Sequence, residues 1–125
     1  MVHSHLSKIG ALLLSFVFLC TFPVALKAHA FPDRSDPKVG ATVKSCPEKV
    51  RIWFDSDLEP VFSKLVIRDE KDRKVDKDDS RVNPDDPRLL EVSVPTLQPG
   101  QYRAMWSVVA RDGHRTNGDF QFKVK

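Results

Sequence analysis

Apolar and polar residues alternate along the end of the chain in the way typical of a strand with one buried face. Phe120, Phe122 and Val124 lie on one side of this expected strand, and the polar residues between them lie on the other. The same period of two runs through residues 101–109. Both segments are therefore predicted to be half-buried β-strands.

Several other short apolar runs have the length and composition of strands, and turn residues separate them. The clearest are 50–54, 65–67 and 90–94, and weaker strands are predicted at 39–43 and around Val75. About seven short strands with frequent turns predict an all-β fold, an antiparallel sandwich or barrel of immunoglobulin-like type. The turns fall at Asp36-Pro37, Pro47-Glu48, Asn83-Pro84, Gln98-Pro99-Gly100 and Asn117-Gly118.

Two further expectations concern the core and the longest connection of this sandwich. Strand alternation predicts that the aromatic residues pack inside, with Trp53 and Trp106 meeting from facing sheets. The charged stretch from Asp69 to Asp86 is predicted to be a solvated hairpin or loop. Its acids do not have EF-hand spacing, and no glycine supplies the sharp turn of a calcium loop.

The beginning of the chain has the organisation of a secretory signal peptide. No charged residue occurs from Ile9 to Leu26, Lys8 precedes this apolar stretch, and small residues follow Pro23. We therefore predict a cleaved leader at 1–28 and a single domain at 29–125. An uncleaved membrane anchor is the alternative, because about 18 apolar residues lie near the lower limit for spanning a bilayer.

Charge and cysteine content restrict the possible functions. Removing the leader takes away two lysines and no acid, so the net charge falls from +3 to +1. No basic run or aromatic–basic stripe remains, so no nucleic-acid partner is predicted. Cys20 lies in the leader and Cys46 is left unpaired, so a monomeric domain is expected to depend on its hydrophobic core and not on a disulfide.

The predicted domain contains only two histidines, His29 and His114. If His29 becomes the first residue, its ring nitrogen and its α-amine, with a reference pKa of about 7.7–8.0, can chelate one metal ion. His114 ends the run Arg111-Asp112-Gly113-His114, in which residues two apart can project to the same side. Nitrogen-rich tetragonal surroundings select Cu(II). We therefore consider one Cu(II) ion per chain, held by two nitrogens of His29, one of His114 and a carboxylate oxygen of Asp112.

Each part of this pattern also has a simpler interpretation. A histidine after a strand is usually a turn or surface residue, and Asp-Gly is a common turn dipeptide. The run Ala28-His29-Ala30 also permits cleavage after Ala30, which would discard the first ligand. The residues alone therefore leave copper binding as one hypothesis among several.

Four segments of the chain are similar to one family of exported proteins. That family opens with His-Ala and a Ser-x-Pro-x-x-Gly element, as residues 29–40 do, and ends with Gly-x-Phe-x-Phe-x-Val, as residues 118–124 do. Residues 50–60 resemble its second strand and the Glu-Pro segment that follows. Residues 97–114 resemble its signature of Pro-Gly-x-Tyr, Trp and Asp-Gly-His. The family is that of the CopC copper-resistance proteins.

This resemblance implies an exported Greek-key β-sandwich or barrel that binds Cu(II). It places the family's N-terminal histidine on His29 and its Asp-Gly-His ligands on Asp112 and His114, and it favours cleavage before His29. Family members act in copper resistance and homeostasis as carriers or buffers in the periplasm, often beside a membrane protein that takes up copper. A membrane copper-transport protein is therefore an expected partner.

The chain also departs from the family pattern. Some relatives place a ligating glutamate where Ser56 stands here, with Asp55 and Asp57 beside it, so an additional acidic ligand is left open. Met105 is the only methionine after the leader, so no thioether Cu(I) site is predicted, and the role of Cys46 is left open.

Two other classes of function compete with a copper carrier. A histidine brace on a β-sandwich could serve a copper-dependent oxidase or monooxygenase, but a carboxylate in the copper plane would occupy a position that oxygen needs. A metal-free sandwich that binds another protein is the third hypothesis. The prediction is a binding protein and not an enzyme.

Overall fold

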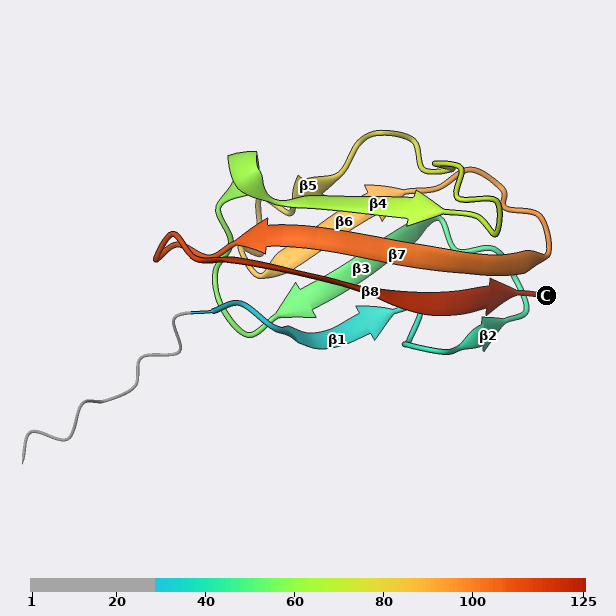
Figure 1. Ribbon diagram of the computed structural model, residues 1–125, viewed down its shortest axis with the longest axis horizontal. Coiled ribbons are helices and arrows are strands. Elements are labelled where there is room, and N and C mark those ends of the chain that lie inside the picture. The colour runs from blue at the N-terminus through green and yellow to red at the C-terminus, as the bar shows by residue number, and fades with distance from the viewer. Residues whose placement is uncertain (1–28) are drawn as a thin grey trace, which may run out of the picture.

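The computed structural model describes residues 29–125, which form two four-stranded sheets packed face to face (Figure 1). The predicted leader lies outside the described residues. The strand orders are β1–β3–β6–β5 and β2–β8–β7–β4. The elements are β1 (Pro32–Asp36), β2 (Thr42–Val43), β3 (Lys49–Phe54), η1 (Pro60–Phe62), β4 (Lys64–Arg68), β5 (Arg81–Val82), β6 (Leu89–Ser93), β7 (Gly100–Val109) and β8 (Arg115–Val124).

The predicted all-β sandwich is confirmed. Neighbouring strands are antiparallel, except that β2 runs parallel to β8, which the sequence did not predict. Residues 29–125 contain no helix long and apolar enough to cross a bilayer. The hydrophobic core lies between the sheets, and alternation supplies it, as in β8, where Phe120, Phe122 and Val124 are buried.

The predicted meeting of Trp53 and Trp106 is wrong. Val50, Ile52 and Phe54 point into the core from β3, so Trp53 between them faces outward. The guanidinium carbon of Arg34 lies 3.7 Å from the centre of the outward Trp53 ring. Inside the core, Phe54 contacts Trp106 in place of Trp53, and the centres of the Phe54 and Trp106 rings are 5.2 Å apart.

The weak strands of the sequence prediction are only partly correct. The segment at 39–43 contributes just the two residues of β2, and Val75 lies beside an isolated bridge between Arg68 and Lys74. The sequence missed β1, whose residues are nearly all polar and exposed because it is an edge strand beside β3. It also missed β5, which is too short to show a period.

The charged stretch from Asp69 to Asp86 is more than a solvated loop. Strand β4 lies at the edge of its sheet, and side chains of this stretch satisfy its outward backbone donors. Asp76 Oδ2 accepts the Ile67 N–H at 2.9 Å, and Ser80 Oγ accepts the Leu65 N–H at 2.8 Å. These side chains cover an edge that would otherwise be open to pairing with another strand.

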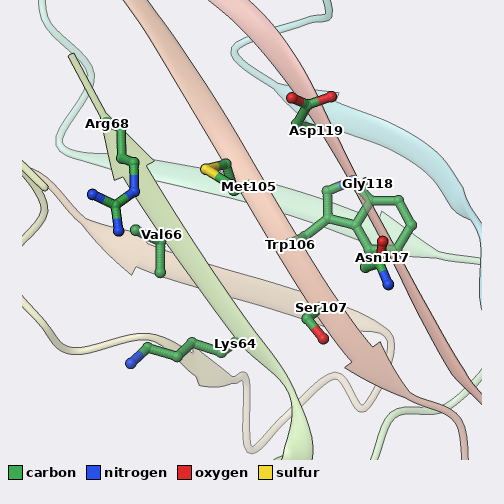
Figure 2. A pocket seen from close by; sticks show the side chains of 9 residues that line it. All are labelled: Lys64, Val66, Arg68, Met105, Trp106, Ser107, Asn117, Gly118 and Asp119. Atoms are coloured by element: carbon green, nitrogen blue, oxygen red, sulfur yellow. The ribbon is translucent and has the colours of Figure 1, made fainter. Parts of the chain in front are cut away.

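Gly118 is required by close packing within the second sheet. It pairs with Trp106 across β7 and β8, and Figure 2 shows the Trp106 indole beside it. A Cβ at position 118 would lie 2.6 Å from Trp106 Cζ2. Gly118→Ala is therefore expected to destabilise the fold by about 1–3 kcal/mol, as overpacking does elsewhere.

Urea unfolding of the parent and of Gly118→Ala measures this loss. The control is the same substitution in a Trp106→Phe background. Phenylalanine lacks the part of the indole ring that the new methyl group would meet, so the penalty of Gly118→Ala should be smaller there. An unchanged penalty in the double variant would contradict this packing account.

Candidate metal centre

The turn between β7 and β8 places Asp112 and His114 at one end of the sandwich (Figure 1). The Ala110 N–H donates to the His114 carbonyl at 3.0 Å, and the Gly113 N–H donates to the Ala110 carbonyl at 2.9 Å. Gly113 has a φ of 89°, a conformation that glycine adopts without strain. This turn therefore fixes the backbone on both sides of His114.

Asp112 and His114 contact each other through backbone and side chain. Asp112 Oδ1 accepts the His114 backbone N–H at 3.0 Å, and Asp112 Oδ2 lies 3.1 Å from His114 Nδ1. The pKa of Asp112 is lowered, mainly because its carboxylate accepts the backbone N–H of His114. Partial desolvation acts in the opposite direction, and the His114 and His29 rings lower the pKa further. Asp112 is therefore a carboxylate at neutral pH. The side chains of Asp112 and His114 are both exposed to solvent.

The segment after His29 is held against both sheets. Ala30 is fully buried, and its carbonyl accepts the Thr116 hydroxyl of β8 at 2.6 Å. Phe31 makes two hydrogen bonds with Asp55, which follows β3. The Phe31 N–H donates to Asp55 Oδ1 and the Asp55 N–H donates to the Phe31 carbonyl, both at 2.9 Å.

This anchoring brings His29 to the Asp-Gly-His turn. The ring centres of His29 and His114 are 4.9 Å apart with an angle of 79° between the planes, and the Phe31 ring lies 6.2 Å from His29. The structure thus gathers His29, Asp112 and His114 at one end of the sandwich. Their nitrogen and carboxylate donors are the ligand types that suit Cu(II).

The three side chains are neighbours without forming a finished coordination sphere. In the part of the chain that the structure describes, no group of three or more His, Cys, Asp or Glu side chains is already spaced to hold an ion. Asp112 is instead bonded to its own turn and to His114. In the intact chain the nitrogen of His29 is a peptide amide, and it becomes an amine only if the chain is cut before this residue.

The other candidate ligands from the sequence are engaged elsewhere. Asp55 accepts the Phe31 N–H, and Asp57 Oδ1 lies 3.3 Å from Arg88 Nε. Cys46 packs against the core, and its Sγ accepts the Leu97 N–H at 3.1 Å.

Met105 lies on the outer face of the second sheet, in a shallow hollow of about 540 Å³ (Figure 2). Lys64, Arg68 and Asp119 are among the residues lining this hollow. None of the three predicted ligands lines it, so the hollow and the candidate metal centre are separate places.

The sequence reasoning missed the two residues that anchor the N-terminal segment, Thr116 and Asp55. A signal for Thr116 existed, because inward positions of β8 alternate and a polar residue stands at one of them near the Asp-Gly-His turn. From the sequence, Asp55 is a candidate only for an additional ligand, because its bond to a backbone N–H 24 residues away leaves no local pattern.

Comparisons with known proteins agree on one family. Residues 33–125 match the family model described as the CopC domain. The crystal structure of CopC from Methylosinus trichosporium OB3b superposes with a TM-score of 0.73 at 29% identity, covering 78% of this chain and 94% of that one. PcoC, a methionine-rich copper resistance protein from Escherichia coli, superposes with a TM-score of 0.61 at 29% identity, covering 78% of this chain and 100% of that one.

One curated relative is a longer protein that contains a region similar to this chain. The copper transport protein CutJ of Bacillus subtilis is 32% identical over 109 residues, which is 86% of this chain. The match covers 20% of CutJ, so this chain spans about a fifth of that relative's length.

Proposed function

This chain belongs to the CopC family, and from that premise we propose that it binds one Cu(II) ion through His29, Asp112 and His114. The family relationship makes it a copper-related protein. The finer proposal is a protein exported to the periplasm that sequesters or carries Cu(II) after losing residues 1–28.

The arrangement of the three side chains carries this proposal. The imidazole rings of His29 and His114 lie 4.9 Å apart, although the two residues are distant in the sequence, and Asp112 Oδ2 is 3.1 Å from His114 Nδ1. The carboxylate of Asp112 adds negative charge beside the nitrogen donors. A site of this composition favours storage or transport of Cu(II), because the carboxylate would occupy a position that oxygen chemistry needs.

The burial of Ala30 supports cleavage before His29. A cut after Ala30 would remove a fully buried residue together with the carbonyl that accepts the Thr116 hydroxyl. A cut before His29 keeps both and leaves a free α-amine on the residue beside His114. The proposed domain therefore comprises residues 29–125, and residues 1–28 are the proposed leader.

We assign the site no catalytic step, and we propose a membrane copper-transport protein as the partner that receives the ion. CutJ supports this choice, because that copper transport protein contains a region similar to this chain within a much longer polypeptide. In this proposal the chain binds Cu(II) outside the membrane and a separate membrane protein receives the ion from it.

Thermal unfolding with and without Cu(II) tests the proposed function. Cu(II) at 100 times its dissociation constant should stabilise the protein beginning at His29 by about 2.7 kcal/mol, because the ion binds the folded state. Asp112→Asn should reduce this stabilisation. Asp119→Asn, which changes an exposed acid on β8, is the matched control and should leave it unchanged. Equal stabilisation of all three proteins would contradict the assigned site.

A further inference from the structure

We propose that Thr116 and Asp55 are positioning residues that hold the N-terminal ligand at the copper site. This inference rests on the proposed function and concerns how His29 reaches the metal. Neither residue is proposed to touch the ion.

The two residues hold the two sides of one peptide group, the one that joins Ala30 to Phe31, and they do so from opposite sheets. Thr116, on β8, donates its hydroxyl to the Ala30 carbonyl at 2.6 Å. Asp55, just after β3, accepts the Phe31 N–H at Oδ1 and donates its own backbone N–H to the Phe31 carbonyl, both at 2.9 Å. The Ala30 side chain between them is fully buried. The N-terminal segment is therefore fixed at three hydrogen bonds and one buried side chain.

We call the bonds of Thr116 and Asp55 to residues 30 and 31 the clamp. In the proposed domain, His29 is the one residue that precedes it. The backbone of Ala30 cannot swing away without breaking the Thr116 bond and exposing a core position, so few rotations remain to His29. A ligand held near its binding position loses less conformational freedom when the ion binds. The clamp is therefore expected to raise the affinity for Cu(II) without contributing a donor atom.

Most of the side-chain hydrogen bonds of Thr116 and Asp55 go to the N-terminal segment. The Thr116 hydroxyl faces the Ala30 carbonyl across the rim of the sandwich, two residues after His114. Asp55 Oδ1 receives the Phe31 N–H and a longer bond from the Ser56 hydroxyl at 3.4 Å. Both residues thus act on the backbone of the segment that carries the first ligand.

The experiment uses the exported protein, obtained by expressing the full chain with its leader, and mass spectrometry identifies its first residue. Cu(II) affinity is measured by competition with a chelator for Thr116→Val and Asp55→Ala. Each variant should bind about tenfold more weakly, the lower end of the effect of residues that orient metal ligands. Thr116→Ser, which keeps the hydroxyl, should recover most of the affinity that Thr116→Val loses.

Ser80→Ala is the matched control. It also removes a hydroxyl that bonds the backbone, at Leu65, and this bond lies away from residues 29–31. It should lower stability without changing Cu(II) affinity. If Ser80→Ala weakens binding as much as Thr116→Val, general destabilisation explains the effect and the positioning role is overturned.

A second readout without metal separates this inference from the proposed function. Hydrogen exchange of the Phe31 amide in the copper-free protein should accelerate in Asp55→Ala and stay slow in Ser80→Ala. A parent that does not bind Cu(II) overturns the proposed function, whatever the exchange shows. A parent that binds, with variants of unchanged affinity, overturns only the positioning role.

Discussion

One glycine added ahead of His29 is expected to weaken Cu(II) binding by about a hundredfold or more. The extra residue converts the α-amine of His29 into a peptide amide and removes one of the two donors of the chelate. Loss of a residue that merely orients a ligand costs about 10–100-fold in metal affinity, so loss of a donor should reach at least the upper end. Chelator competition measures the change.

The matched control for this extension is a glycine added after Lys125, at the other terminus. Its affinity should equal that of the parent. His114→Ala in the same assay should also weaken binding strongly, because it removes the other imidazole. An N-terminally extended protein that binds as tightly as the parent would show that the amine is not a ligand.

Glu91→Gln is expected to destabilise the fold by about 3 kcal/mol at neutral pH. The Glu91 side chain is 3% exposed. Its Oε1 lies 3.0 Å from Arg81 Nη2, 3.7 Å from Lys49 Nζ and 3.2 Å from Asn83 Nδ2, and its Oε2 lies 3.5 Å from Arg51 Nε. Breaking a buried charge pair by removing one partner costs about 3–5 kcal/mol, and the partly exposed cations place this case at the lower end.

The pH dependence of this loss has a definite sign. Burial raises the pKa of Glu91, but the Arg81 hydrogen bond and the charges of Lys49 and Arg81 outweigh it and hold the pKa below its ordinary value of 4.5. The stabilisation by Glu91 is therefore complete above pH 4.5 and is lost as the pH falls through the folded-state pKa. Glu91→Gln should then approach the parent in stability under acid conditions.

Urea unfolding at neutral and acid pH measures both effects. Glu48→Gln, which changes an exposed acid beside Lys49, is the control and should alter stability little. A loss in Glu91→Gln that persists unchanged at acid pH would contradict the ionic explanation.

The parts of the fold with a clear period could be predicted, and those held by tertiary bonds could not. β7 and β8 have long alternating patterns, and their buried faces follow from the sequence. β1 is polar and forms because β3 offers it a pairing edge. The side chains of Asp76 and Ser80 cover the edge of β4, and no local pattern indicates such distant partners.

Trp53 illustrates a further limit of sequence reasoning. Both Trp53 and Phe54 suit a core, and period-two alternation allows only one of them to face inward. Val50 and Ile52 fix that choice in favour of Phe54. The size of Trp53 favours a core position, but its position in the alternation of β3 makes it face outward.

For the candidate metal centre, scarcity of histidine indicated the residues and the fold explains their proximity. The predicted domain has two histidines, His29 and His114, and the Asp-Gly-His turn adds Asp112. The bonds that hold the segment at Ala30 and Phe31 depend on strand neighbours far along the chain. Ligation by the three residues stays a prediction.

Electron paramagnetic resonance of the exported protein with one equivalent of Cu(II) tests the central claim most directly. A site made of the His29 amine and ring, the His114 ring and the Asp112 carboxylate predicts a single tetragonal signal with nitrogen coupling, which His114→Ala should alter. A spectrum of aqueous Cu(II), or a bound signal identical in His114→Ala, would contradict the assignment.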